Sequence, residues 1–208
     1  MQRRGPVWPV RLHEAADEIT WAAGLNLLWL AGTLTGGVLL GVGPATLAAG
    51  TLARRHAGGE KFRATSAFAA AYRREFVRGS VLVLPLLGAA ALLTVNYRYF
   101  ASVTAVLPRL VTLAALAVLV VVASFLLPMA VHYDLRASVL LPKASLFALT
   151  RPAPSVLLLL VAACTAYASR VFPFLVVVIS VGGWIQLDTW LCLRFFAENE
   201  ARLRGEPR

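Results

Sequence analysis

The clearest candidate for chemistry in this chain is Asp188, a carboxylate within a long apolar segment. Glycines and the polar Gln186 precede it, so this part of the segment is the least lipid-like. A charged group at the centre of a membrane helix costs about 2.5–3.5 kcal/mol, and such groups commonly carry protons, ions or substrates. Gln186 and Asp188 are therefore candidate polar groups of an intramembrane site. The alternative is that Asp188 reaches the inner membrane surface and pairs with an arginine.

Asn26 is a second polar side chain inside an apolar run, close to Trp29. Burying an amide is costly unless it is hydrogen-bonded. We therefore expect Asn26 to bond another helix or to lie at the membrane interface beside Trp29.

The other residues with catalytic or metal-binding chemistry are scattered. His13, His56 and His132 lie in three separate segments, and no histidine or cysteine spacing typical of a zinc site occurs. Cys164 and Cys192 fall at different expected depths, which argues against a disulfide. No Gly-x-Ser-x-Gly motif is present. The sequence predicts no catalytic residue, no cofactor and no metal site, and hence no enzyme.

The glycine-rich stretch from Gly24 to Gly50 does not fit a phosphate-binding loop, because Pro44-Ala45 stands where the Lys-Ser/Thr pair would be needed. Its small residues recur every four positions, which allows close helix approach in lipid. They are Thr33, Gly37, Gly41, Ala45, Ala49 and Ala53. We expect another helix to pack on this stripe, and a kink or new helix start at Gly43-Pro44. The break is either structural or, as in some transporters, a substrate site.

Composition places these residues in a membrane protein. The chain has 208 residues, 59% hydrophobic and 14% charged, with a mean hydropathy of +0.74. A soluble domain is about 45–50% apolar and about 25% charged. The net charge of +10 comes from basic residues between apolar runs, which is typical of topology signals rather than of nucleic-acid binding.

The apolar runs predict a single all-α membrane domain over residues 1–208 with five transmembrane helices, each of about 20 residues or more. The spans are 21–53, broken near 43–44, then 79–95, 106–131, 155–169 and 171–196. The first run is longer than the ~7–15 apolar residues of a signal peptide, so we expect it to be retained.

Two connecting segments are amphipathic and basic. Lys61–Ser80 predicts an interfacial helix carrying Arg73, Arg74 and Arg78, and Arg136–Ser155 predicts a second one, broken by Pro142. Each either lies against the bilayer or forms a docking surface for a cytoplasmic partner.

With five spans, fourteen Lys and Arg residues fall on one side and six on the other. The positive-inside rule then predicts an external N-terminus and a cytoplasmic C-terminus.

Three sequence stretches carry a family resemblance: "LNLLWL" (Leu25–Leu30), "GVGPATLAA" (Gly41–Ala49) and "FAAAYRREFVRGS" (Phe68–Ser80). Together they resemble the YesL-like family of small bacterial integral membrane proteins, domain of unknown function 624. The resemblance implies a multi-pass protein of the bacterial cytoplasmic membrane that accompanies ABC-type carbohydrate uptake. It supplies no catalytic residue, and Asp188 has no counterpart in the family pattern.

Two functions remain open at this point. The leading one is a non-enzymatic accessory protein whose partners are the lipid bilayer and permease or ATPase subunits of a transporter. The alternative is a stand-alone small-solute transporter that uses Asp188 as its intramembrane acid.

Overall fold

The computed structural model describes residues 8–203 except 133–136, 151, 176, 177 and 179, and every regular element in this part of the chain is a helix. The elements are α1 (Trp8–Thr35), α2 (Leu39–Ala57), α3 (Ala64–Arg74), α4 (Phe76–Ser102), α5 (Val106–His132), α6 (Ala137–Thr150), α7 (Pro152–Val171) and α8 (Val181–Leu203). Three of them, α4, α5 and α7, are long and apolar enough to cross a membrane. The expected all-helical, membrane-type fold is confirmed.

The first apolar segment is a helical hairpin rather than one broken span. α1 and α2 are joined by a tight turn at Gly36–Val38, where Gly37 and Val38 have φ values of 72° and 60°. Leu39 N donates to Gly37 O at 2.8 Å across this turn. The predicted break at Gly43-Pro44 is therefore wrong. Gly37 reverses the chain earlier because glycine enters the left-handed region without steric cost.

This hairpin folds the predicted stripe of small residues back on itself. Thr33 belongs to α1 and Gly41 to α2, and a Cβ on Gly41 would overlap the carbonyl oxygen of Thr33. Ala45 of α2 is fully buried, whereas Gly37 in the turn has no neighbour within 4 Å of its Cβ position. The stripe thus holds α1 against α2 and does not present one continuous face to a separate helix.

Pro44 lies inside α2 without interrupting it. A proline has no N–H, so the carbonyl of Leu40 four residues earlier loses its usual helical donor. The hydroxyl of Ser80 in α4 can supply a donor instead, because its Oγ lies 3.1 Å from Leu40 O, although Phe76 O in its own helix lies at 2.8 Å and shares the single proton. The two helices cross at the same place, where a Cβ on Gly79 would lie only 2.7 Å from Pro44 N. The proline is therefore accommodated by a neighbouring helix.

The two predicted interfacial helices differ from expectation at their boundaries. The first one ends at Arg74, and Phe76–Ser80 already belongs to α4 after a break at Glu75. The second one is α6, and Pro142 lies within it instead of breaking it. Arg136 and Arg151, near the limits of the second predicted helix, lie outside the described residues.

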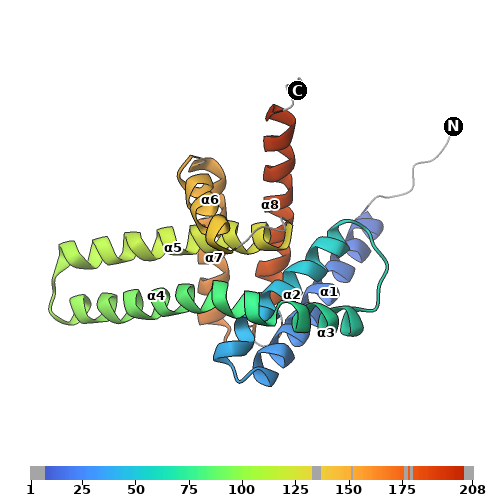
Figure 1. The fold of residues 1–208 in the computed structure, drawn as a ribbon, viewed down its shortest axis with the longest axis horizontal. Coiled ribbons are helices and arrows are strands. Elements are labelled where there is room, and N and C mark those ends of the chain that lie inside the picture. Colours follow the sequence, from blue (N-terminus) through green and yellow to red (C-terminus); the bar gives the residue numbers. More distant parts are fainter. Residues whose placement is uncertain (1–7, 133–136, 151, 176–177, 179, 204–208) are drawn as a thin grey trace.

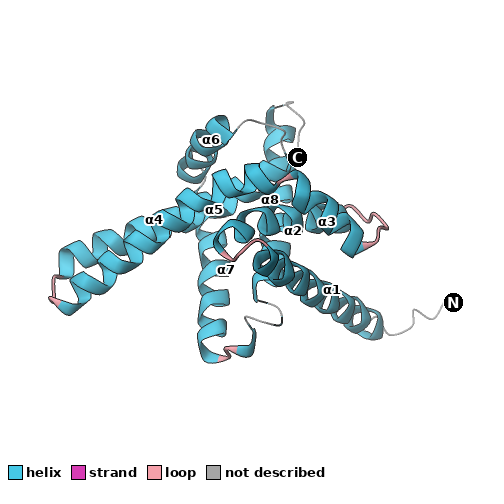
Figure 2. Cartoon of the chain, turned by 60° about the horizontal axis from the view of Figure 1, so that its bottom comes forward, coloured by secondary structure: helices cyan, strands magenta, loops and turns pink. Residues whose placement is uncertain are grey.

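The long helices α4 and α5 form an antiparallel hairpin that extends away from the other helices (Figures 1 and 2). The predicted spans 79–95, 106–131 and 155–169 fall within α4, α5 and α7. The predicted span 171–196 overlaps α8, which is α-helical from Val181; Val178 and Ser180 immediately before it are π-helical. The chain needs residues to turn between α7 and α8, and Pro173 at this turn cannot continue the hydrogen bonding of α7.

The buried side chains form two apolar clusters that share α2. One surrounds Phe125 of α5 and includes Leu47 of α2, Leu140 of α6, Leu158 of α7 and Cys192 of α8. The other joins Leu25 of α1 to the alanine face of α2, Phe68 of α3 and Ile185 of α8. Helices far apart in sequence are therefore held to α2 and α5, which position the polar groups described below.

The middle of α1, the end of α2 and the first part of α8 meet at Glu18, His56 and Gln186. Glu18 Oε1 lies 3.2 Å from His56 Nε2, and Gln186 Nε2 donates to Glu18 Oε2 at 3.3 Å. Groups this close cannot lie on opposite faces of a hydrocarbon core about 30 Å thick. The single first span predicted over 21–53 would place the N-terminal segment and Arg54–Arg55 on opposite sides of the membrane. That part of the prediction is wrong, because the turn at Gly36–Val38 adds one reversal of the chain.

Candidate functional site

Asn26 of α1 caps the start of α8 from a neighbouring helix. Its Oδ1 accepts hydrogen bonds from Val181 N at 3.1 Å and from Gly182 N at 2.9 Å. The first N–H groups of a helix have no partner within the helix, and asparagine is a preferred cap for them. A Cβ on Gly182 would overlap Ala22 O, so only glycine permits this close approach. The amide thus bonds another helix, as its burial in an apolar segment requires.

A chain of side-chain hydrogen bonds continues from Asn26 toward the end where α1 starts. Trp21 Nε1 donates to Gln186 Oε1 at 3.3 Å, and Gln186 in turn donates to Glu18. Trp21 also stacks on the ring of His56, with centroids 4.3 Å apart. Gln186 therefore joins α1 to α8.

Asp188 lies deep among α2, α5 and α8, with 3% of its surface exposed. Ser124 of α5 lies close enough to interact with its carboxyl group, yet neither Ser124 Oγ nor Asp188 Oδ1 completes a hydrogen bond. None of the described Lys or Arg side chains forms an ion pair with Asp188. The expectation of an arginine partner at the interface is not met in this part of the chain.

The space beside Asp188 is small. A cavity of about 10 Å³ is lined by Thr46, Trp184, Asp188 and Thr189 together with apolar side chains of α5. That volume holds about one water molecule. It is far below the roughly 300 Å³ at which small-molecule sites begin.

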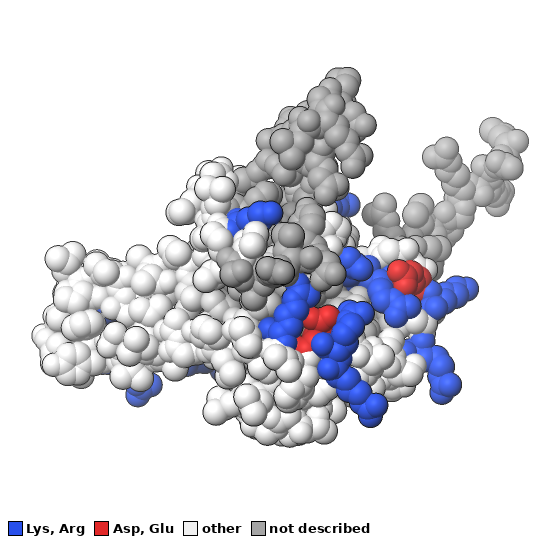
Figure 3. Space-filling model, viewed as in Figure 1, with Lys and Arg blue, Asp and Glu red and all other residues white. Residues whose placement is uncertain are grey.

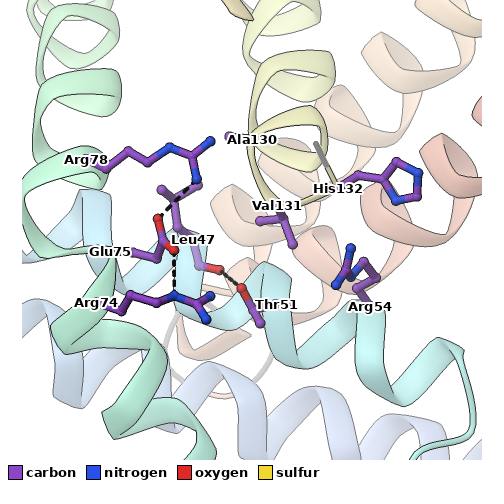
Figure 4. A pocket seen from close by; sticks show the side chains of 9 residues that line it. All are labelled: Leu47, Thr51, Arg54, Arg74, Glu75, Arg78, Ala130, Val131 and His132. Atoms are coloured by element: carbon purple, nitrogen blue, oxygen red, sulfur yellow. Dashed lines mark hydrogen bonds and ion pairs between the residues drawn. The ribbon is translucent and has the colours of Figure 1, made fainter. Parts of the chain in front are cut away.

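A much larger pocket, of about 460 Å³, opens where α2, α3, α4 and α5 meet. Figure 4 shows Arg54 of α2 and His132 of α5 across this pocket from Arg74, Glu75 and Arg78. Its remaining wall is formed by Leu47, Thr51, Ala130 and Val131. We refer to this cavity as the arginine pocket.

Glu75 organises two of the three arginines. Arg74 Nε donates to Glu75 Oε1 at 2.9 Å, and Arg78 Nη1 donates to Glu75 Oε2 at 3.4 Å. Glu75 is 9% exposed and immediately precedes α4, where the partial positive charge of a helix start favours a carboxylate. The Arg54 guanidinium has no hydrogen bond or ion pair with any residue that the structure describes. The pocket therefore carries positive charge that Glu75 does not balance.

The surface around the pocket is also basic. Figure 3 shows Lys and Arg gathered over the end that holds α2, α3 and the start of α4, whereas the extended α4–α5 hairpin is almost free of them on this face. We call this end the basic pole; it comprises Arg54, Arg55, Lys61, Arg63, Arg73, Arg74, Arg78 and His132.

The structure divides the predicted site residues into separate groups. Arg74 and Arg78 line the pocket, while the neighbouring Arg73 is exposed outside it. Sequence reasoning missed Arg54 and Glu75. Arg54 and Arg55 follow an apolar segment, which indicates that both lie at the membrane interface. Nothing in the sequence indicates that Arg54 and Glu75 line the same pocket.

The cysteines and the metal-ligating residue types lie apart from one another in the part of the chain that the structure describes. Cys164 and Cys192 are both free, the first exposed and the second buried. Within the described residues, no group of three or more His, Cys, Asp or Glu side chains is placed to hold a metal ion.

Comparison with known proteins gives two matches. Residues 22–97 match the family model described as "Protein of unknown function, DUF624". The chain is also similar to the protein named "Uncharacterized protein YesV" of Bacillus subtilis (strain 168), with 35% identity over 143 residues that cover 67% of each chain. No solved structure matches the chain.

Proposed function

The chain belongs to the DUF624 family, and from that premise we propose that it is a non-enzymatic accessory protein of a bacterial cytoplasmic membrane. In this proposal its basic pole faces the cytoplasm and docks on permease or ATPase subunits of a solute-uptake system, with carbohydrate as the solute class. The observation that carries the proposal is the concentration of Lys and Arg, including an arginine pocket, at one end of the molecule.

The proposed topology has six long helices in three hairpins, α1–α2, α4–α5 and α7–α8, with both termini on the side of the basic pole. All but three of the 20 Lys and Arg residues of the chain then fall on that side. The exceptions are Arg98, Arg109 and Arg170. This bias is stronger than that of the five-span arrangement, and the positive-inside rule makes that side cytoplasmic.

Reporter fusions test the topology directly. A reporter active only in the cytoplasm should be active at the N-terminus and the C-terminus, and inactive when inserted at Thr104 between α4 and α5. Activity of a periplasmic reporter at either terminus would contradict the arrangement.

The accessory role is favoured over transport by the volume around Asp188. A solute carrier needs a site for its solute, and the cavity beside Asp188 holds about one water molecule. The larger arginine pocket lies at the basic pole, where a partner can reach it.

Co-purification in mild detergent tests the docking role. We expect a permease or ATPase subunit to accompany the wild-type chain in stoichiometric amount. A variant with Lys61, Arg63 and Arg73 each changed to Glu should lose this partner. The three wild-type side chains are exposed and attract an acidic partner surface, which the introduced glutamates would repel. Arg98→Glu at the far end of α4 is the control and should retain the partner. Solute flux in proteoliposomes that contain only this chain would instead favour the transporter alternative.

A further inference from the structure

We propose that the arginine pocket binds the phosphate group of an anionic phospholipid headgroup. The inference goes beyond docking to a protein partner, but it rests on the proposed position of the basic pole at the cytoplasmic membrane surface. The cavity volume of about 460 Å³ falls within the roughly 300–1,000 Å³ typical of small-molecule sites.

The charge of the lining selects an anion. Three guanidinium groups, those of Arg54, Arg74 and Arg78, face one carboxylate, that of Glu75. Glu75 is already occupied by Arg74 and Arg78, so Arg54 has no balancing charge among the described residues. A phosphate group offers several acceptor oxygens with negative charge, and guanidinium groups bind such oxygens in pairs.

The pocket is also held in shape before any ligand arrives. Arg74 belongs to α3 and Arg78 to α4, and the buried carboxylate of Glu75 between them accepts a hydrogen bond from each guanidinium group. Arg54 approaches from α2, which is packed against α4 at the crossing of Gly43 and Gly79. Groups that are already ordered lose less conformational entropy on binding, which favours affinity.

The surroundings favour a lipid over a soluble phosphate. Val77 and Val81, on the same helix as Arg78, have 74% and 59% of their surface exposed. Leu47, Ala130 and Val131 give the pocket an apolar wall. An exposed apolar helix surface beside an arginine cluster suits a molecule with acyl chains below its phosphate group, and basic pockets between membrane helices on the cytoplasmic side commonly bind such headgroups.

Thermal unfolding of the purified full-length chain in a neutral detergent tests the proposal. Phosphatidylglycerol, phosphatidylcholine and inorganic phosphate are each titrated as separate probes. A ligand that binds only the folded state raises Tm with its concentration. We expect phosphatidylglycerol to raise Tm, and the other two probes to leave it unchanged.

Arg54→Gln is the decisive variant, because it removes the unpaired guanidinium. We expect about tenfold or more phosphatidylglycerol to be needed for the same Tm increase, as for the loss of one charged hydrogen bond. Arg73→Gln makes the same charge change at the residue next to Arg74 but outside the pocket, and should titrate as wild type. Arg54→Lys keeps the charge and loses the paired geometry, so an intermediate shift is expected.

Three outcomes would overturn the proposal. Equal weakening by Arg54→Gln and Arg73→Gln would mean that overall charge, not the pocket, attracts the lipid. An equal, Arg54-dependent rise with inorganic phosphate would assign the site to a soluble phosphate. Stabilisation that is unchanged in both Arg54 variants, with wild-type Tm in the absence of lipid, would place the lipid elsewhere. The topology reporters and partner co-purification test the proposed function, whereas the lipid titrations test this site. A failure of one can therefore be distinguished from a failure of the other.

Discussion

Gly43 of α2 and Gly79 of α4 approach so closely that a Cβ on Gly43 would overlap the carbonyl oxygen of Gly79. The contact joins the first hairpin of the chain to the second, beside the arginine pocket. Helices in lipid gain no hydrophobic drive from one another, so close backbone packing of this kind holds them together.

Gly43→Ala and Gly79→Ala should each destabilise the protein, because backbone atoms must move to admit the new methyl group. The cost of overpacking is about 1–3 kcal/mol, of which up to about 1 kcal/mol is offset by the higher helix propensity of alanine. Thermal unfolding in detergent measures the effect. Gly88→Ala on α4 is the control, since nothing lies within 4 Å of its Cβ position. Unchanged Tm in both test variants would refute the crossing.

Ser80→Ala should cost about 1 kcal/mol, the usual net value of a hydrogen bond. The hydroxyl lies within reach of Leu40 O and also of Phe76 O in its own helix. In a Pro44→Ala background the restored amide N–H of residue 44 can satisfy Leu40 O, so the same Ser80→Ala change should cost less. A double-mutant cycle on unfolding free energies gives this difference. Strict additivity would show that Ser80 does not substitute for the donor missing at Pro44.

Asn26→Ala should destabilise the protein by about 1–3 kcal/mol, because two buried N–H groups at the start of α8 lose their acceptor. Hydrogen exchange should rise at Val181 and Gly182 before it rises elsewhere in α8. Asn96→Ala on α4 makes the same change at a half-buried position and serves as the control. Equal protection at Val181 and Gly182 in the variant and the wild type would exclude the capping role.

Asp188→Asn should leave the unfolding free energy unchanged or increase it. The carboxyl group is buried without a cationic partner among the described residues, so a neutral side chain of the same shape removes a cost without breaking an ion pair. Asp17→Asn at an exposed position of α1 is the control and should change stability by less than about 0.5 kcal/mol. Partner co-purification should also be unaffected by Asp188→Asn. A variant that folds normally but loses a biological activity would instead favour the transporter alternative.

Several elements could be predicted because the signals for them are local. The positions of α4, α5 and α7 follow from apolar runs bounded by polar or basic residues. The bounds of α5 match their prediction within one residue, whereas α4 and α7 extend beyond the predicted 79–95 and 155–169. The basic character of α3 is likewise visible in the sequence. The arginine pocket was not predictable, since Arg54, Glu75 and His132 come from three elements that only the packing of α2, α4 and α5 brings together.

The sequence by itself determined the membrane class, the helical content and the family, because composition, apolar run length and short motifs are properties of the chain alone. Only the tertiary structure decided where the first segment reverses. A proline inside an apolar run predicts a break when its helix is considered in isolation, yet α2 continues through Pro44 because Ser80 of another helix lies against the carbonyl that the proline leaves free. The reversal at Gly36–Val38 then brings Glu18 beside His56 and returns α1 and α2 to the same end of the molecule. That pairing depends on contacts between distant residues, which local sequence patterns do not encode.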